Sequence, residues 1–248
     1  MRTIAISNHK GGVGKTTTAI NLSVALSNIG KKVLLVDLDP QANLTNILLK
    51  DPPQETITEA LQDPNKELNI ISLSQNLDFV GANIRLTRID DYLTTRNKKE
   101  YALKKILDRY NTQYDYIILD CPPALSSVTI NALVCAKEIF ITITPEALSI
   151  QGLNSLKDLI KAIKEQYNKG LKISGLLITR YNARKKINQT IANLMANQYG
   201  KVLFKTKIRE NVAITESQLY REDIFSYAPT SNGATDYKNF AMEVIAME

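Results

Sequence analysis

The chain has 248 residues, of which 44% are hydrophobic and 23% are charged, a composition typical of globular proteins. Its net charge of +6 favours an anionic partner, and no apolar run is long enough for a membrane span. Its two cysteines, Cys121 and Cys135, lack the spacing of a disulfide framework or a zinc site, so we expect a reducing cytoplasm.

The predicted strands and helices alternate along the chain. Thr3–Ser7 predicts a short strand, and Thr16–Gly30 predicts a helix that ends at its glycine. Continuous apolar runs then predict strands within the ranges Lys31–Asp39, Tyr114–Pro123, Glu138–Pro145 and Leu171–Tyr181, the last of the series. Helical spacing marks the ranges Lys98–Tyr110 and Ser149–Tyr167.

The segment Lys50–Glu67 is polar and contains three prolines, so we expect a surface excursion rather than a domain boundary. The alternation predicts an α/β fold: a single doubly wound, mostly parallel sheet flanked by helices, forming one domain over residues 1–248. No helix-turn-helix extension is expected before the first strand.

The stretch "NHKGGVGKTTT" (Asn8–Thr18) joins the first strand to the first helix. A glycine-rich loop of this kind turns backbone N–H groups towards phosphates, and the helix that follows directs its positive end at the same anion. Lys15 is expected to neutralise the β- and γ-phosphates, Thr16 to ligate Mg²⁺, and Thr17 to contact the α-phosphate. The usual pattern has glycine at position 9; this chain has His9 there, followed by a second lysine, Lys10.

Carboxylates follow two predicted strands. Asp37 and Asp39 end one of them, and Asp120 ends another. Because ligands bind beyond the carboxyl ends of parallel strands, these side chains are expected to lie near the glycine loop. We expect Asp120 to hold Mg²⁺ with support from Asp37, and Asp39 to orient an attacking water. The alternative is that these aspartates only cap the turns that follow.

The segments "KGGVGKTTTAINLSVALSNIGKKVLLVDLDPQANLT", "YDYIILDCPPALSSVTINAL" and "ITPEALSIQGL" resemble the ParA/Soj partition ATPases, within the deviant Walker A group of P-loop NTPases that includes MinD. The similarity runs from Ile4 to the C-terminal "GATDYKNFAMEVI". It implies that Lys10 reaches across a homodimer to the partner's phosphates, so that two subunits enclose two ATP molecules. It also agrees with a role for Asp39 in hydrolysis and for Asp120 in binding magnesium.

The resemblance further places Asn182 and Pro145 beside the adenine. The expected cofactors are ATP and Mg²⁺. The expected catalytic residues are Lys10, Lys15 and Asp39. The expected nucleotide-binding residues are Lys10, Gly11, Gly12, Val13, Gly14, Lys15, Thr16, Thr17, Pro145 and Asn182, and the expected magnesium ligands are Thr16, Asp37 and Asp120.

The span from Arg180 to Arg209 carries eight cations and no Asp or Glu. An unopposed basic surface binds the DNA backbone without regard to sequence. The resemblance likewise implies DNA binding, to which the segment "IRENVAITES" (Ile208–Ser217) contributes. The candidate DNA contacts are Arg184, Lys185, Lys186, Lys201, Lys205, Lys207 and Arg209.

The leading hypothesis is therefore a Mg²⁺-dependent, cytoplasmic and nucleoid-associated ATPase for DNA segregation. Its ATP-bound homodimer binds double-stranded DNA non-specifically, and a ParB-like partner stimulates slow hydrolysis and release. Three alternatives stay open: a ParA-like ATPase that positions a protein cargo, a MinD-like membrane-surface regulator, and an iron–sulfur carrier or reductase. The acidic C-terminal segment disfavours the membrane regulator, and the two separated cysteines disfavour a cluster protein.

Overall fold

One sheet runs through the protein, whose computed structural model describes residues 1–63, 65–94 and 97–248. In the described residues its strand order is β3-β4-β2-β5-β1-β6-β7-β8. Among the strands of the described residues, only β3 and β4 pair antiparallel. The strands are β1 (Arg2–Ser7), β2 (Val33–Asp37), β3 (Ile71–Ser74), β4 (Leu77–Val80), β5 (Tyr116–Asp120), β6 (Glu138–Ile143), β7 (Lys172–Tyr181) and β8 (Leu203–Arg209). The predicted mostly parallel sheet is confirmed.

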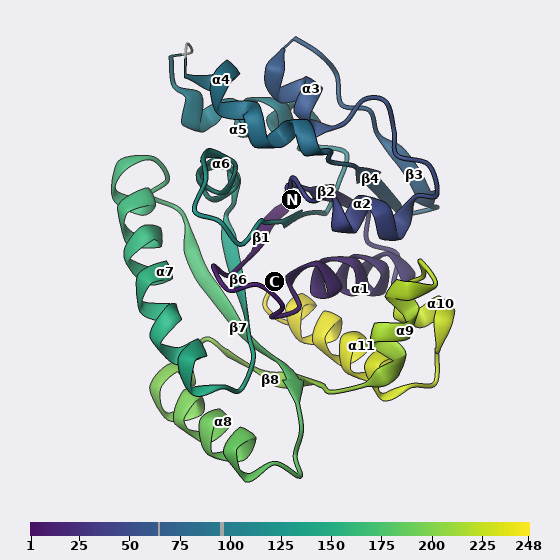
Figure 1. Ribbon diagram of the computed structural model, residues 1–248, viewed down its shortest axis with the longest axis vertical. Coiled ribbons are helices and arrows are strands. Elements are labelled where there is room, and N and C mark those ends of the chain that lie inside the picture. Colours follow the sequence, from purple (N-terminus) through teal and green to yellow (C-terminus); the bar gives the residue numbers. More distant parts are fainter. Residues whose placement is uncertain (64, 95–96) are drawn as a thin grey trace.

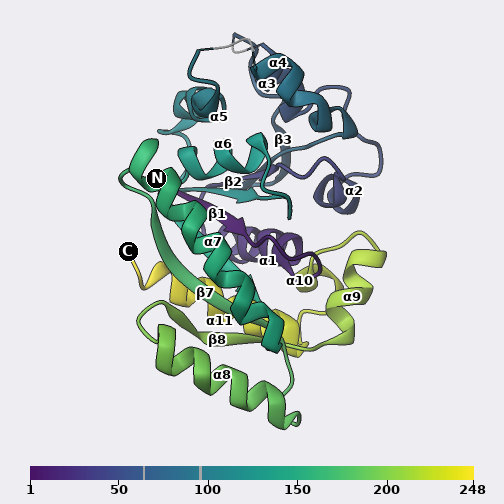
Figure 2. The same cartoon turned by 60° about the vertical axis from the view of Figure 1, so that its left-hand side comes forward.

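Helices cover both faces of this sheet (Figures 1 and 2). In chain order, the helices before β6 are α1 (Lys15–Asn28), α2 (Asn43–Leu48), α3 (Ile57–Gln62), α4 (Ile89–Leu93), α5 (Ala102–Leu107) and α6 (Ser127–Cys135). Those after β6 are α7 (Ala147–Gln166), α8 (Lys186–Tyr199), α9 (Val212–Leu219), α10 (Ile224–Tyr227) and α11 (Asn232–Ile245). Short 3-10 turns are η1 (Ile84–Arg88), η2 (Lys99–Tyr101) and η3 (Asp108–Tyr110). Within the described residues, no helix has the length and apolar character that crossing a membrane requires.

Two apolar cores lie on opposite faces of the sheet. Leu34 and Val36 of β2 point into one core, together with α5, α6 and α7, whereas Val33 and Leu35 point into the other, together with α1 and α11. Successive strand residues face opposite sides, so a strand covered on both faces needs an unbroken apolar run. That requirement explains the apolar runs in the sequence.

Glycines in the left-handed region bound α1. Gly14 precedes the helix with φ +82°, and Gly30 follows it with φ +85° and donates its N–H to the carbonyl of Ser27 at 2.9 Å. A side chain disfavours this conformation at both positions. The predicted end of the helix at Gly30 is confirmed.

The structure corrects two expectations. Leu171–Tyr181 is not the last strand, because β8 pairs parallel with β7 at the edge of the sheet. Only Phe204 and Ile208 of β8 are buried. The lysines between them interrupt the apolar residues, so a search for continuous apolar runs does not detect this strand. Lys50–Glu67 is not merely a surface excursion, since it contains α3, whose Ile57 and Leu61 are buried in a core.

The predicted helix Lys98–Tyr110 is broken into η2, α5 and η3. The hairpin of β3 and β4 had no counterpart in the predicted series, because both strands are only four residues long. These differences all lie away from the carboxyl ends of β1, β2 and β5.

Candidate active site

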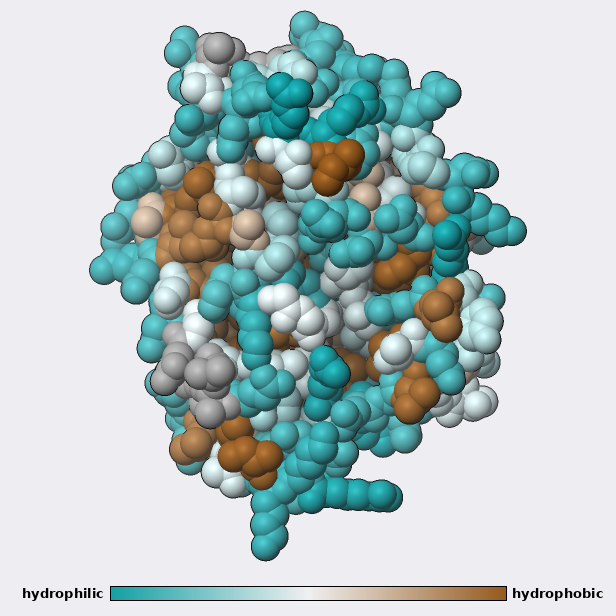
Figure 3. Space-filling view, in the orientation of Figure 1, coloured by the Kyte–Doolittle hydropathy of each residue, from teal (hydrophilic) through white to brown (hydrophobic). Residues whose placement is uncertain are grey.

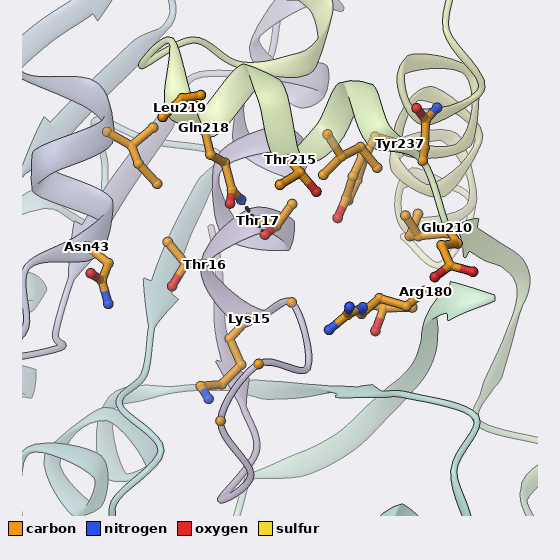
Figure 4. Close-up of a pocket in the computed structure, with 18 of the residues that line it drawn as sticks. Lys15, Thr16, Thr17, Asn43, Arg180, Glu210, Thr215, Gln218, Leu219 and Tyr237 are labelled. Carbon is orange, nitrogen blue, oxygen red and sulfur yellow. Dashed lines mark hydrogen bonds between the residues drawn. The ribbon is translucent and has the colours of Figure 1, made fainter.

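The glycine loop after β1 opens into a cavity of about 1100 Å³. This cavity brings together seven of the residues predicted for the nucleotide site, namely Gly11, Gly12, Gly14, Lys15, Thr16, Thr17 and Asp39, and also the candidate DNA contact Arg209. Figure 4 shows Lys15, Thr16 and Thr17 rising in succession from the loop along the first turn of α1. Gly12 and Gly14 both have positive φ, so the loop needs glycine at these two positions.

The loop is anchored from neighbouring segments. The Thr179 hydroxyl on β7 donates to the carbonyl of Val13 at 2.9 Å, and the Thr179 side chain lies 3.6 Å from where a Gly14 Cβ would stand. The Lys15 ammonium donates to the carbonyl of Lys10 at 3.1 Å. Burial lowers the pKa of Lys15, while the charge of Asp120 opposes that effect. The loop is therefore held in shape with a buried cation inside it.

Asp37 and Asp120 are direct neighbours in the parallel ladder of β2 and β5. Asp37 is fully buried and accepts bonds from the Asp39 N–H (3.0 Å), the Thr45 N–H (2.9 Å) and the Thr45 hydroxyl (2.7 Å). Burial raises the pKa of Asp37 to about 6, although these donors stabilise its charged form. Asp37 thus secures the start of α2; its expected support of magnesium stays a prediction.

Asp120 differs from Asp37 because neither carboxylate oxygen has a hydrogen-bond partner among the described residues, although the side chain is fully buried. Burial raises the pKa of this carboxyl, the Asp37 carboxylate adds to the rise, and Thr16 and Lys15 oppose it. An orphaned buried carboxylate beside a phosphate loop suits a cation. Mg²⁺ takes one or two carboxylate ligands and keeps several of its waters, so a single strand-end carboxylate of this kind fits it.

Asp39 lines the cavity at the turn into α2. Its carboxylate accepts the Gln41 N–H at 2.9 Å, and its carbonyl accepts the N–H of Ala42, which has φ +52°. The second carboxylate oxygen of Asp39 accepts no hydrogen bond from the described residues. A polar group in this position is able to hold a water at the cavity wall.

Lys10 does not line the cavity. Its ammonium pairs with Glu146, the residue preceding α7, at 2.5 Å, and both side chains are partly exposed. In the single protomer the second lysine is therefore directed towards α7 rather than towards the chain's own phosphate site. The predicted reach across a dimer stays a prediction.

Asn182 and Pro145 also stand outside the described cavity lining. Asn188, near the start of α8, connects them: its side chain accepts the Asn182 N–H at 2.9 Å and donates to the Pro145 carbonyl at 3.3 Å. The expected adenine contacts therefore lie close together, and their role stays a prediction. Asn188 carries no sequence motif that marked it beforehand.

The segment Ile208–Ser217 forms a wall of the cavity. It continues into Gln218, whose side-chain amide donates to the Thr17 hydroxyl at 2.5 Å from α9 (Figure 4). Sequence reasoning assigned this segment to DNA and did not single out Gln218 or Thr179 as cavity residues. No spacing rule connects them to the glycine loop, because the fold alone brings the distant segments together.

The basic span is opposed by acids from elsewhere in the chain, which corrects the expectation of an unopposed surface. Arg209 pairs with Asp236 of α11 at 2.6 Å, and Lys185 pairs with Glu210 at 3.0 Å. Lys207 lies 5.1 Å from the centre of the Tyr181 ring. Four candidates are exposed and form no ion pair with a described residue: Arg184, Lys186, Lys201 and Lys205.

A strand, glycine loop and helix with a buried lysine and a strand-end aspartate define a P-loop protein of the α/β class. The AAA-domain family model (AAA_31) matches residues 1–173. Soj of Bacillus subtilis, described as a sporulation initiation inhibitor protein, is 37% identical over 98% of each chain. The chromosome-partitioning ATPase Soj of Treponema pallidum is 34% identical over 100% of this chain and 98% of its own. This chain belongs to the Soj/ParA family of ATPases.

A solved structure shares the fold. Cobyrinic acid a,c-diamide synthase from Mycobacterium smegmatis, with bound ADP and magnesium, superposes with a TM-score of 0.85 at 30% identity, over 99% of this chain and 94% of that chain. The likeness therefore extends over nearly the whole sheet and its helices.

Proposed function

We propose that this protein is an ATP-driven partition ATPase that binds Mg²⁺ and ATP in the cavity at the glycine loop. The single observation that carries the proposal is the arrangement of Lys15, Asp39 and the orphaned Asp120 around that loop. The bound ADP and magnesium of the synthase relative support it. Membership in the Soj/ParA family supports the partition role.

Different residues of the site have different roles in the transfer of the phosphoryl group to water. Loop N–H groups and Lys15 bind the β- and γ-phosphates, and stabilise the charge that moves to the leaving oxygen. Thr16 and Asp120 would hold a magnesium ion, with support from Asp37, the neighbour of Asp120 in the β2–β5 ladder, and the ion would neutralise phosphate charge. Asp39 orients the attacking water from the turn beside α2. Slow hydrolysis without a partner is part of the proposal.

Dimerisation is the proposed switch. ATP bound in one protomer offers its phosphates to Lys10 of a second copy, and Lys10 leaves Glu146 to bind them. A cation donated in trans stabilises the transferring phosphoryl group, as arginine fingers do in other NTPases. Exposed ion pairs contribute little to stability, so the exchange of partners costs little.

The dimer is proposed to bind double-stranded DNA through the exposed cations of the β7–β8 edge, which brings the protein to the nucleoid. Release follows hydrolysis, stimulated by a ParB-like partner. The contacts are directed at phosphates, so binding should ignore base sequence and weaken steeply with salt. Figure 3 shows hydrophilic side chains projecting at the end of the molecule where β7 leads into α8.

Gel filtration and DNA binding of the full chain test the proposal together. With ATP and Mg²⁺, Asp39→Ala should accumulate a dimer because hydrolysis stops, whereas Lys10→Ala should stay a monomer that still binds ATP. The wild type should bind arbitrary duplex DNA only with ATP. Monomers under every condition would contradict the switch, and an ATP-dependent dimer that ignores DNA would contradict the partition role.

A further inference from the structure

Arg180 has a backbone conformation that side chains disfavour. Its φ is +51°, in the left-handed region, at the cavity end of β7. The residues on either side are firmly held: Thr179 donates to the Val13 carbonyl, and the Tyr181 carbonyl accepts the Glu210 N–H at 2.9 Å. Strain of this kind persists where the surroundings impose it, and it is common at ligand sites.

The Arg180 side chain lines the cavity of the glycine loop. Figure 4 shows it extending from the strand end into the space between Lys15 and Glu210. Arg180 forms no ion pair and no hydrogen bond of its side chain with another described residue. A guanidinium at the wall of a phosphate site is thus free to bind a ligand.

The two carboxylates in its surroundings do not explain its presence. The charge of Arg180 helps to lower the pKa of both Glu146 and Glu210, although their bonds to other side chains are the larger causes. Glu146 already pairs with Lys10 at 2.5 Å, and Glu210 with Lys185 at 3.0 Å. Each acid has a closer cation, so Arg180 is not needed as their counter-ion.

We propose that the Arg180 guanidinium binds the phosphate chain of the nucleotide in its own protomer. This inference rests on the proposed nucleotide site and adds a second cation to it. Lys15 is buried inside the loop, whereas Arg180 approaches from the β7 wall, so the two reach the polyphosphate from different sides. A planar guanidinium donates two parallel bonds to phosphate oxygens. Lys10 stays outside the cavity for the trans contact, and Arg180 acts in cis.

Binding of ADP to the full-length protein with Mg²⁺ tests the proposal, because a contact in cis needs no dimer. Hydrogen bonds to charged groups convert to roughly a 10- to 100-fold change in affinity. Arg180→Ala should weaken ADP binding by about that factor, and Arg180→Lys should lose less because it keeps the charge. The affinity of the wild type should also fall with added salt more steeply than that of Arg180→Ala.

Arg180→Gly separates the side chain from the backbone. Glycine accepts φ +51° without strain, so this variant should melt at or above the wild-type temperature and still lose ADP affinity as Arg180→Ala does. Arg184→Ala is the matched control, because Arg184 is exposed four residues further on and does not line the cavity. Its ADP affinity should equal that of the wild type.

Three outcomes would overturn the proposal: Arg180→Gly binding ADP like the wild type, an unchanged salt dependence in Arg180→Ala, or loss of DNA binding or dimerisation alone with ADP affinity intact. Failure of the proposed nucleotide site looks different. In that case the wild type would bind ADP no better than Lys15→Ala does.

Discussion

The ends of β1, β2 and β5 form an inner wall behind the glycine loop, whereas β7 and β8 lie at one edge of the sheet. Both regions carry charged side chains, but they hold them in different ways. At the wall, Asp37, Asp120 and Lys15 are buried; Asp37 and Lys15 bond to nearby backbone, whereas Asp120 has no hydrogen-bond partner among the described residues. At the edge, Arg209 and Lys185 are exposed and pair with acids at other positions in the fold. The wall holds its charged groups in buried, fixed positions. At the edge, the number of cations left unpaired depends on which acids the fold brings next to them.

Lys15→Ala gives the largest expected effect at the wall. It removes a buried cation from the phosphate loop, and a charged hydrogen bond contributes about 3 kcal/mol at the upper end, or roughly 100-fold in affinity. Isothermal titration with ADP and Mg²⁺ measures the loss. Lys201→Ala is the exposed control and should bind as the wild type does. Equal ADP affinities for Lys15→Ala and the wild type would contradict the proposed nucleotide site.

Asp120→Asn should stabilise the ligand-free protein and abolish the gain in ADP affinity that Mg²⁺ provides. Folding raises the pKa of the Asp120 carboxyl. The folded protein therefore loses stability as the pH rises above the ordinary pKa of an aspartate, near 4. At pH 7.5 the neutral amide should therefore add on the order of 1 kcal/mol, seen as a melting temperature about 2–4 °C higher.

The same pair of proteins gives a pH test. As the pH falls from 7.5, wild-type Asp120 takes up its proton at a higher pH than an ordinary carboxyl because its pKa is raised, so the difference in melting temperature between wild type and variant should shrink. A variant less stable than the wild type at every pH would show that the Asp120 charge is balanced within the ligand-free protein.

Arg209→Ala sharpens the comparison at the edge. The variant leaves Asp236, which is only 8% exposed, without its cation, so we expect destabilisation of about 1 kcal/mol after allowance for the partly exposed arginine. Urea unfolding measures it. Arg184→Ala, which breaks no ion pair of the described residues, should leave the unfolding midpoint unchanged. If both variants lose DNA binding and neither loses stability, the distinction between paired and free cations is wrong.

Lys205→Ala should have the smallest effect. Lys205 is exposed and its ammonium is free of ion pairs in the described residues, so the variant should keep its stability and lose one phosphate contact. The slope of log affinity against log salt should then decrease by about 0.9 for duplex DNA. Filter binding at several salt concentrations, with ATP, measures it. An unchanged slope would place the DNA contacts elsewhere.

Sequence by itself determined the parallel sheet, the glycine loop and the strand-end aspartates. Each of these is a local pattern: an apolar run needed by a strand covered on both faces, glycines needed for positive φ, and polar residues where a buried strand ends. Family resemblance extended the same residues to ATP and magnesium. All of these features follow from neighbours along the chain.

Only the tertiary structure decided which charges remain free and which distant residues enter the cavity. Asp236 meets Arg209 across 27 positions, and Gln218 meets Thr17 across 201. No periodicity encodes such meetings, because they follow from the packing of α9 and α11 against the rest of the fold. The strained turn of Arg180 has the same origin, since neighbouring strands and loops impose it.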